Sequence, residues 1–428
     1  MNASPRDLRT QCCIVGGGPA GMMLGLLLAR AGVDVTVLEK HRDFLRDFRG
    51  DTVHPSTLEI LDQIGLLDRF QKLGGRREDT ISMRFADRMI TLGDFSHLRA
   101  KFPYLVLIPQ WDFLDLLADE AKRYPNFRLL LETEGRDLLR DGERVVGVRA
   151  FADGGPIAIR SDLVVATDGR HSDMRRAARL ASHAFGAPMD VMWFRLPVAD
   201  NERPQTYGVV GKGELLVMIN RNDYWQSALV IPKGTASQIT AQPIEQFHAR
   251  LSRVAPFLGE RARSIATWDQ VKLLEVQVDY LKRWHMPGLL LIGDAAHAMS
   301  PVGGVGINLA IQDAVATANI VGPAHVRGEV PDDALLSKVQ ARRRVATHFT
   351  QAVQRVIQHN IIARALDASG PPPNAPRWLA TLLSPGWVRS IAPRVFGLGF
   401  DRERLELPAR TAPPPSAAAT RAESTRPA

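Results

Sequence analysis

The sequence predicts an α/β fold: a discontinuous α/β domain, an inserted mainly-β domain of antiparallel strands, and C-terminal helices. Three observations predict it. The chain begins as strand, glycine-rich turn, helix and strand; residues 182–279 read as short strands; and an α/β pattern returns after residue 279. With 428 residues, 45% of them hydrophobic, the chain is long enough to build two cores.

The first element is a βαβ unit with a glycine fingerprint. "CCIVG" reads as an apolar strand, "GGPAG" as a turn and "MMLGLLLARAG" as a helix. In the turn, Gly16 permits a tight bend, Gly18 lets the backbone approach a diphosphate, and Gly21 lets helix and strand pack closely. A diphosphate would then lie at the helix N-terminus, beside Pro19 and Ala20.

An acidic residue ends the second strand, "DVTVLEK". Glu39 follows Gly21 by eighteen residues, where a carboxylate accepts hydrogen bonds from an adenosine ribose, and Lys40 comes directly after it. An acid at this place fits a free 2′-hydroxyl, as in FAD or NAD, better than a 2′-phosphate. The unit is therefore predicted to be a Rossmann-like GxGxxG domain that binds a dinucleotide.

Two later strands also end in an acid and a glycine. "PIAIRSDLVVATDG" ends in Asp168-Gly169, and "LLLIG" leads into Gly293-Asp294. After the second of these, "PVGGVGIN" is a glycine-rich approach to a helix that begins near Asn308. Residues 103–122 read as a short strand followed by an amphipathic helix, with Gln110 at the start of that helix.

Residues 182–279 differ from the rest of the chain in composition and in hydrophobic pattern. Five strands rich in Trp, Tyr, Val and Met, interrupted by one helix at about 242–256, indicate a separate domain. We expect Trp193, Tyr207 and Trp225 to be core residues more often than walls of a substrate cage. The predicted division is 1–75, 100–181 and 280–366 for the nucleotide-binding domain, 76–99 and 182–279 for a substrate-binding β-sheet domain, 367–406 for C-terminal helices, and 407–428 for a disordered tail.

Residues 49–67 read as a loop and a helix. Ser56 as N-cap and Glu59 three residues on predict a capping box. Arg49, in a chance RGD tripeptide, is either a surface arginine or an anion contact beside the diphosphate.

A long helix spans about 332–366, and two short apolar helices follow, "RWLATLLS" and "WVRSIAPRVFGL". These pack on their own domain or provide a homodimer or peripheral membrane contact.

Composition narrows the class of protein. The net charge of +8 is spread along the chain without a compact basic run, which argues against nucleic-acid binding and fits anionic ligands. The two cysteines, Cys12 and Cys13, are neighbours in a strand, which suggests a reducing compartment, most simply the cytoplasm. Residues 12–29 carry no charge, but their glycines break any membrane-spanning helix or signal segment. The histidines are too scattered to imply a metal site.

Three signatures in this order, "GGGPAG" with Glu39, "LVVATDG", and "LLLIGDAAHAMSPVGGVGINLAIQDA", resemble the class A FAD-dependent aromatic hydroxylases, the 4-hydroxybenzoate and polyprenylphenol hydroxylase group. The resemblance implies that Asp294, after Gly293, binds the ribityl chain of non-covalent FAD. It implies that Gly304 and Gly306 let backbone approach the flavin, and that Ile307 and Asn308 face its N1 and O2 edge. His297 is expected to support the motif rather than act as a base.

The same resemblance assigns further candidates. Asp168-Gly169 would lie near the diphosphate and the nicotinamide cofactor, and Arg49 and Gln110 near the diphosphate and ribityl chain. Pro301 would border the place where oxygen reacts; Pro301 and Arg49 are the candidate catalytic residues, and both are also candidate cofactor contacts. Thr167 stands where the family usually has Ala. The family's substrate-deprotonating residue has no visible match.

The activity implied is that of a monooxygenase. NADPH or NADH would reduce FAD transiently, O₂ would form a flavin C4a-hydroperoxide, and one oxygen would pass to an aromatic small molecule, a phenol or aryl acid. The absence of a second GxGxxG unit fits a transient nicotinamide. The alternatives are an FAD-dependent oxidase or a double-bond reductase on the same fold, and a non-catalytic flavin-bound interaction module.

Overall fold

The structure is a computed structural model that describes residues 6–45, 52–85, 88–199, 206–221, 223–367 and 389–410. Arg49 and the RGD tripeptide, the "RWLATLLS" segment and residues 411–428 lie outside the described residues.

One large sheet organises the nucleotide-binding part of the chain. Its main order is β19-β20-β11-β1-β2-β8, with a β9–β10 hairpin joined to β11. The bounds are β1 Arg6–Val15, β2 Val35–Leu38, β8 Phe127–Leu130, β9 Glu134–Asp141, β10 Arg144–Ala152, β11 Gly155–Ala166, β19 His285–Met286 and β20 Leu289–Leu291. β1 pairs in parallel with β2 and β11, and β11 with β20. The central strands are buried and apolar: all four residues of β2 are buried, and Gly135 of β9 lies against Val15 of β1.

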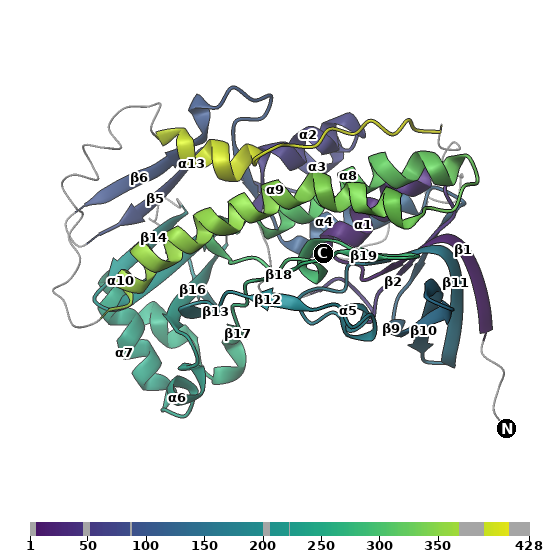
Figure 1. Ribbon diagram of the computed structural model, residues 1–428. Coiled ribbons are helices and arrows are strands. Elements are labelled where there is room, and N and C mark those ends of the chain that lie inside the picture. Colours follow the sequence, from purple (N-terminus) through teal and green to yellow (C-terminus); the bar gives the residue numbers. More distant parts are fainter. Residues whose placement is uncertain are drawn as a thin grey trace, which may run out of the picture.

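Helices from distant parts of the sequence cover this sheet (Figure 1). α1 (Pro19–Arg30) packs on α8 (Gly306–Val326) and α4 (Gln110–Ala121), and α9 (Asp333–Ile357) crosses over α8. α9 continues through η6 (Gln358–Ile362) into α10 (Ala363–Ala365), as the predicted long helix requires. α2 (Pro55–Gln63), α3 (Leu67–Gln71) and α5 (Asp173–Ala177) complete this part.

The segment Val302–Val326, which contains α8, is long and apolar enough to cross a membrane by length and composition alone. However, 78% of its apolar window is buried inside the protein. Burial on that scale is typical of the core helix of a globular domain, and α8 packs between α1 and α9.

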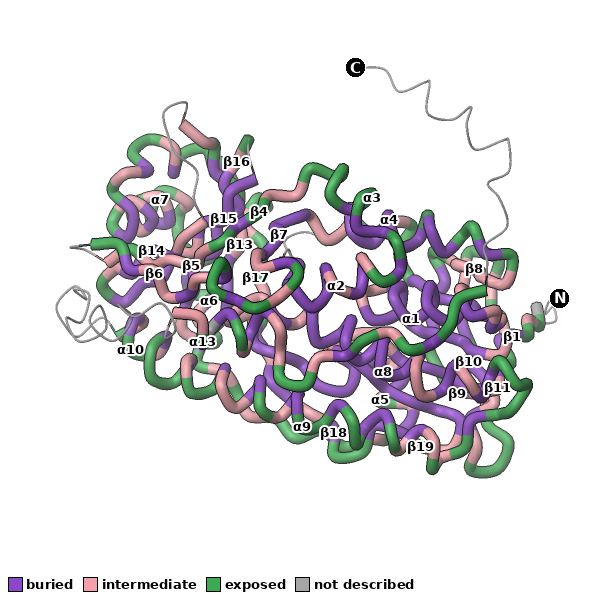
Figure 2. Tube along the Cα trace, turned by 90° about the horizontal axis from the view of Figure 1, so that it is seen from above, coloured by how far each residue is buried: buried purple, intermediate pink, exposed green. Residues whose placement is uncertain are grey.

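A seven-stranded sheet forms the other end of the molecule (Figure 2). Its order is β17-β13-β16-β15-β14-β5-β6. The bounds are β5 Thr80–Arg84, β6 Met89–Asp94, β13 Met189–Pro197, β14 Tyr207–Gly211, β15 Glu214–Asn220, β16 Tyr224–Pro232 and β17 Lys272–Leu274. One face packs on α6 (Ala236–Thr240), α7 (Ile244–Val254) and η2 (Pro256–Ser264). The parallel β14–β5 pair joins residues 80–94 to this sheet.

Small elements connect the two large sheets. β3 (Thr52–Val53), β7 (Leu105–Leu107) and β4 (Arg76–Glu78) form one small sheet, and β12 (Ser182–Ala184) pairs with β18 (Asp279–Leu281). Short turns η1 (Phe95–His97), η3 (Trp268–Gln270), η4 (Gly293–Ala295) and η5 (Val302–Gly304) complete the chain up to α8.

Two local expectations are wrong. The predicted capping box does not form: α2 begins at Pro55 with His54 as N-cap, the Ser56 hydroxyl bonds to Asn308, and Glu59 pairs with Arg402. The predicted disordered tail does not begin at 407, because Leu407 is buried in the main core.

The described C-terminal residues pack on both parts of the chain: residues 391–393 contact β6, and Leu407 is buried in the main core. α13 (Ile391–Pro393) and η7 (Arg394–Leu398) lead into an irregular segment, residues 399–410. The Arg410 N–H donates to the Arg30 carbonyl at 2.7 Å. Of the two expected C-terminal helices, the described residues include part of one, "WVRSIAPRVFGL". It forms a short α-helical turn followed by a π-helical turn.

Candidate active site

The three glycine-containing motifs meet at one edge of the main sheet. Val15 of β1 is paired with Ala166 of β11, which is paired with Leu291 of β20. These strands are parallel, so the residues that follow them emerge side by side. The register thus brings the Gly16 turn, Asp168-Gly169 and Gly293-Asp294 together, at the sheet edge where α/β proteins bind ligands.

The Gly16 turn combines two tightly packed glycines with one that is open. Gly16 has φ +108°, and a Cβ there would lie 2.5 Å from the Thr167 carbonyl oxygen. A Cβ on Gly21 would lie 2.0 Å from the Gly16 carbonyl oxygen. A Cβ on Gly18 would meet no protein atom within 4 Å. Only Gly18 therefore borders open space.

The N-terminus of α1 faces that space without a side-chain cap. Gly18 is the N-cap, Pro19 is the first helical residue, and the first turn contains no acid. The free N–H groups and the helix dipole favour an anion there. Ala20, in the same turn, is buried against the protein.

Glu39 is held beside this turn by backbone donors. Its Oε2 accepts the Gly17 N–H and its Oε1 the His41 N–H, each at 3.0 Å. The side chain is buried, whereas Lys40 is exposed. A carboxylate at this place, beside the glycine turn, is the kind of group that accepts a hydrogen bond from a ribose hydroxyl.

Asp168 uses its carboxylate inside the protein. Oδ1 accepts the Ser172 hydroxyl at 2.5 Å and Oδ2 the Met174 N–H at 3.1 Å, and these bonds fix the start of α5. Burial raises the pKa of Asp168, although these hydrogen bonds oppose the shift. Gly169, with φ +83°, turns the chain immediately afterwards.

Asp294 is far less engaged than Asp168. Among the described residues, the Asp294 carboxylate accepts a long hydrogen bond, 3.5 Å, from Arg170 Nη2, and the Asp294 side chain is 32% exposed. Gly293, with φ +60°, supplies the bend that presents Asp294. The Asp294 carboxylate therefore retains acceptor capacity for a ligand.

The turn that carries Asp294 is anchored from behind. Asp313 of α8 accepts the Gly293 N–H at 3.0 Å and the His297 Nε2–H at 2.6 Å on one oxygen, and Arg343 Nε at 2.9 Å on the other. Burial would raise the pKa of Asp313, but His297 and Arg343 outweigh it and hold that pKa below its ordinary value. His297 is fully buried in this network, as expected of a supporting group.

The Pro301–Val305 loop leads into α8, which, like α1, begins without a side-chain cap. Pro301 is partly buried and is the N-cap of η5; Gly303 and Gly304 have φ +78° and +61°. Val305 is the N-cap of α8 and makes no side-chain cap, and a Cβ on Gly306 would meet no protein atom within 4 Å. The first N–H groups of α8, including those of Ile307 and Asn308, thus begin beside open space.

Sequence reasoning missed the segment that supports this loop. His54 Nε2 donates to the Gly304 carbonyl at 3.0 Å, and a Cβ on Gly304 would lie 2.9 Å from Thr52 Oγ1. The hydroxyls of Ser56 and Thr57 both donate to Asn308 Oδ1, at 2.7 and 2.8 Å. These partners lie about 250 positions apart, so no local pattern could have paired them.

Burial lowers the pKa of His54 to about 4, so its ring is neutral near pH 7.

Gln110 is the first residue of α4, shortly after β7, the strand that pairs with the Thr52 segment. The structure therefore brings Gln110 to the same side of the molecule, while Arg49 lies outside the described residues.

An apolar face of the seven-stranded sheet adjoins the glycine loop. Val302 packs against the hydrophobic cluster on this face. Strand register places a row across it: Trp193, Ala228, Val217, Gly208 and Met83. Trp193 and Val217 are only partly buried, whereas Trp225 belongs to the core on the opposite face and Tyr207 packs against that core.

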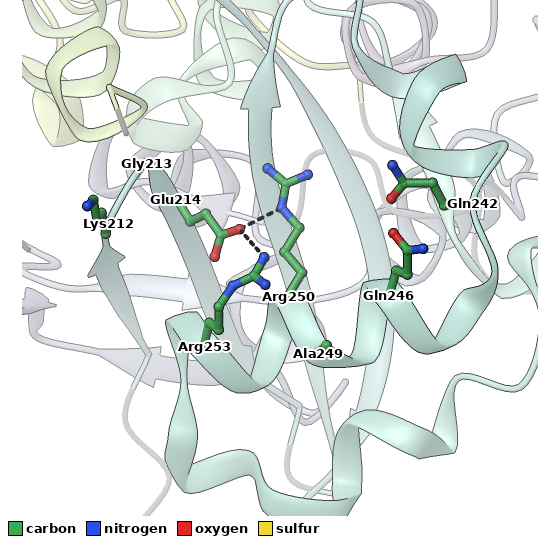
Figure 3. A pocket seen from close by; sticks show the side chains of 8 residues that line it. All are labelled: Lys212, Gly213, Glu214, Gln242, Gln246, Ala249, Arg250 and Arg253. Atoms are coloured by element: carbon green, nitrogen blue, oxygen red, sulfur yellow. Dashed lines mark hydrogen bonds and ion pairs between the residues drawn. The ribbon is translucent and has the colours of Figure 1, made fainter. Parts of the chain in front are cut away.

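A separate cavity of about 390 Å³ lies on the far side of that sheet, between the β14–β15 turn and α7. Arg250 Nε donates to Glu214 at 2.7 Å, Arg253 is 3.7 Å away, and both guanidinium groups turn toward that carboxylate (Figure 3). Burial raises the pKa of Glu214, and the arginines oppose the shift. The cavity is polar and distant from the glycine loop, so it does not suit an aromatic substrate.

Together these residues fit FAD. The open space over Gly18, the starts of α1 and α8 without side-chain caps, and the carboxylates of Glu39 and Asp294 match its diphosphate, flavin, ribose and ribityl groups in chemistry.

Comparison with known proteins gives a consistent result. Residues 9–353 match a family model described as "FAD binding domain". A 6-methylpretetramide 4-monooxygenase of Streptomyces rimosus is 30% identical over 360 residues, 83% of this chain and 86% of that protein. An uncharacterised aromatic compound monooxygenase, YhjG of Bacillus subtilis, is 28% identical over 72% of this chain and 60% of its own length.

The fold is also known from solved structures. That of PqsL from Pseudomonas aeruginosa superimposes with a TM-score of 0.71 at 23% identity and covers 84% of this chain and 98% of that one. The predicted α/β class with a dinucleotide-binding domain is therefore confirmed.

Proposed function

Because the chain belongs to the FAD binding domain family, we propose that it is an FAD-dependent monooxygenase that uses NADPH or NADH to hydroxylate an aromatic small molecule. The family resemblance expected from the three sequence motifs is thereby confirmed. The two relatives described above are monooxygenases, and one of them is named as an aromatic compound monooxygenase.

One observation carries the proposal: the glycine loop joins an uncapped helix start to an apolar sheet face. The loop ends at the N-terminus of α8, whose dipole favours negative charge, and its Val302 packs on the face that includes Trp193. Bound FAD, once reduced, activates O₂ for transfer of one oxygen atom to an organic ring. The apolar face holds such a ring and keeps water away.

We assign the following roles within this proposal. The Gly16–Gly21 turn, with Pro19 and Ala20, binds the diphosphate, and Glu39 binds the adenosine ribose. Asp294, presented by Gly293, accepts a ribityl hydroxyl. The N–H groups of Ile307 and Asn308, approached through Gly304 and Gly306, hold negative charge on the flavin N1 and O2 edge. The supporting observations are the open cradle and the free acceptor capacity.

The remaining assignments concern the surroundings of the flavin and the diphosphate. Pro301 borders the oxygen side of the site, and Asp168-Gly169, Gln110 and Lys40 lie around the diphosphate and nicotinamide. Arg49 is proposed to contact the diphosphate. The bonds of Asp168 to Ser172 and Met174 favour an indirect role, in which it shapes the turn rather than binds the cofactor.

The substrate proposed is an uncharged or weakly acidic aromatic molecule, a phenol or an aryl acid. Support comes from the apolar row of Trp193, Ala228, Val217, Gly208 and Met83, which lies on the sheet face against which Val302 of the glycine loop packs. The half-exposed Ile391 marks the surface proposed for a homodimer or a membrane contact. The compartment proposed is the cytoplasm, supported by two buried free cysteines, Cys12 and Cys13.

The test is anaerobic reduction of the bound flavin by NADPH and NADH, with and without a panel of phenols and aryl acids, followed by admission of labelled O₂. We expect one compound to accelerate reduction strongly and to gain one labelled oxygen atom. Trp193→Ala should weaken that compound's effect, whereas Trp268→Ala, on the opposite side of the sheet, should not. Fast reduction that yields only hydrogen peroxide would replace the proposal with an oxidase.

A further inference from the structure

The C-terminal strap, defined here as residues 399–410, runs along the helix that carries the flavin-facing N-terminus (Figure 1, yellow beside α8). The Glu403 N–H donates to Gln312 Oε1. Farther along, the Glu406 and Leu407 N–H groups donate to Asn319 Oδ1 at 2.8 and 3.2 Å, and Asn319 Nδ2 donates to the Arg404 carbonyl. Side-chain amides of α8 thus fix the strap at two points.

A buried carboxylate of the strap reaches into the protein. The Glu403 side chain is 1% exposed, with Oε2 2.6 Å from Arg342 Nη2 and Oε1 3.5 Å from Arg343 Nη1. Arg343 Nη1 also donates to the Asp401 carbonyl at 3.1 Å. The fully buried Arg343 is therefore held from the strap side by two acceptors.

The same arginine holds Asp313 from the other side. Arg343 Nε donates to Asp313 Oδ1, and Asp313 Oδ2 accepts the N–H of Gly293, the residue next to Asp294. A continuous chain of ion pairs and hydrogen bonds therefore runs from Glu403 through Arg343 and Asp313 to the Gly293-Asp294 turn. Buried charges in such a chain tolerate few geometries, because an unpaired charge is costly.

We propose that Glu403 is a positioning residue for cofactor binding: through Arg343 and Asp313 it fixes the turn that presents Asp294 to FAD. This inference rests on the proposed function, since it takes Asp294 as the ribityl contact. It makes the C-terminal strap part of the cofactor-binding machinery, although no strap residue borders the open cradle at Gly18 or Gly306.

The test compares Glu403→Gln with Glu406→Gln in the full chain. Glu406 is the matched control, because it lies in the same strap, is 68% exposed and approaches Arg342 only to 3.8 Å. We expect the FAD dissociation constant of Glu403→Gln, measured by flavin fluorescence, to rise about tenfold. The fluorescence anisotropy and visible absorption spectrum of the bound flavin, at saturation, should also change. Glu406→Gln should match the wild type in each.

A second variant covers the case in which Glu403→Gln fails to fold. Asn319→Ala removes the distal attachment of the strap and leaves the charged chain intact, so we expect a smaller rise, about threefold, in the dissociation constant. A folded Glu403→Gln with the affinity and flavin spectrum of Glu406→Gln would overturn the inference, as would a lower melting temperature with unchanged affinity. A wild-type chain that binds no FAD would instead overturn the proposed function.

Discussion

The front and the back of the proposed FAD site, called the cradle here, differ in how their polar groups are hydrogen-bonded. The front is the side that faces the open space at Gly18 and Gly306, and the back is the side that packs against the rest of the protein. On the front, α1 and α8 begin without side-chain caps, and the Asp294 carboxylate has only a long contact with Arg170. On the back, Asp313 and Asp168 each accept at least two close hydrogen bonds.

The two strand-tip aspartates show what this difference teaches. Asp168 and Asp294 follow neighbouring parallel strands and stand next to glycines with positive φ. One closes a turn of the protein and the other remains open to a ligand. The comparison predicts that changes on the back cost folding stability and reach FAD only through the turns they hold, whereas changes on the front cost FAD affinity directly and leave folding stability unchanged.

The largest effect is expected from His54, on the back. Burial lowers its pKa from 6.5 to about 4, so the unfolded chain takes up a proton at a higher pH than the folded chain does. The stabilisation of the folded state by the neutral His54 ring is therefore complete above about pH 6.5. It is lost as pH falls toward 4, about 3 kcal/mol in all.

Denaturant unfolding at several pH values measures this loss. His54→Gln should reduce the slope of unfolding free energy between pH 6.5 and 4, whereas the exposed His171→Gln should leave it unchanged. Part of the slope should persist in His54→Gln, because burial also lowers the pKa of His325 to about 4. An unchanged slope in His54→Gln would contradict the burial of a neutral ring.

The next effect concerns Asp294, on the front. Asp294→Ala should raise the FAD dissociation constant about a hundredfold, about 2.7 kcal/mol, because it removes a charged acceptor of a ribityl hydroxyl. Unfolding of flavin-free protein should not change. Asp269→Ala, at an exposed site on the β-sheet domain, is the control. If Asp294→Ala purifies with full flavin, the ribityl contact is wrongly assigned.

Asp168→Ala should behave in the opposite way. It breaks the bonds to Ser172 and Met174 that hold the start of α5, so the free energy of unfolding should fall by about 2 kcal/mol. FAD affinity, measured on the folded fraction, should change much less than in Asp294→Ala. Loss of FAD without loss of stability would place Asp168 on the front and break the comparison.

The sequence predicts the front of the cradle better than the back. The front depends on local chemistry, a glycine spacing and an acid at a strand end, which a few adjacent residues reveal. The sequence does not distinguish the role of Asp168 from that of Asp294. The difference depends on whether the Ser172 hydroxyl and the Met174 N–H turn back toward the carboxylate.

The back depends on contacts between distant segments. His54 meets the glycine loop, and Ser56 and Thr57 meet α8, some 250 residues later. The local pattern around Ser56 predicts an N-cap because it fits that role equally well. Composition predicted disorder from residue 407, but one leucine, Leu407, fits against Gly322 and is buried there. The substrate face depends on strand register, which decides on which side Trp193 lies.

The smallest effect, and the sharpest separation of front from back, concerns two glycines of one turn. Gly18 has φ −75°, which any residue adopts, and a Cβ there meets no protein atom. Gly18→Ala should therefore leave unfolding within about 0.5 kcal/mol of the wild type, while the methyl group intrudes on the diphosphate and raises the FAD dissociation constant about tenfold. In Gly21→Ala the methyl group would lie 2.0 Å from the Gly16 carbonyl oxygen, so the fold itself should be destabilised. Equal loss of stability in both variants would mean that the space over Gly18 belongs to the protein's own packing, and the front would then have no open cradle.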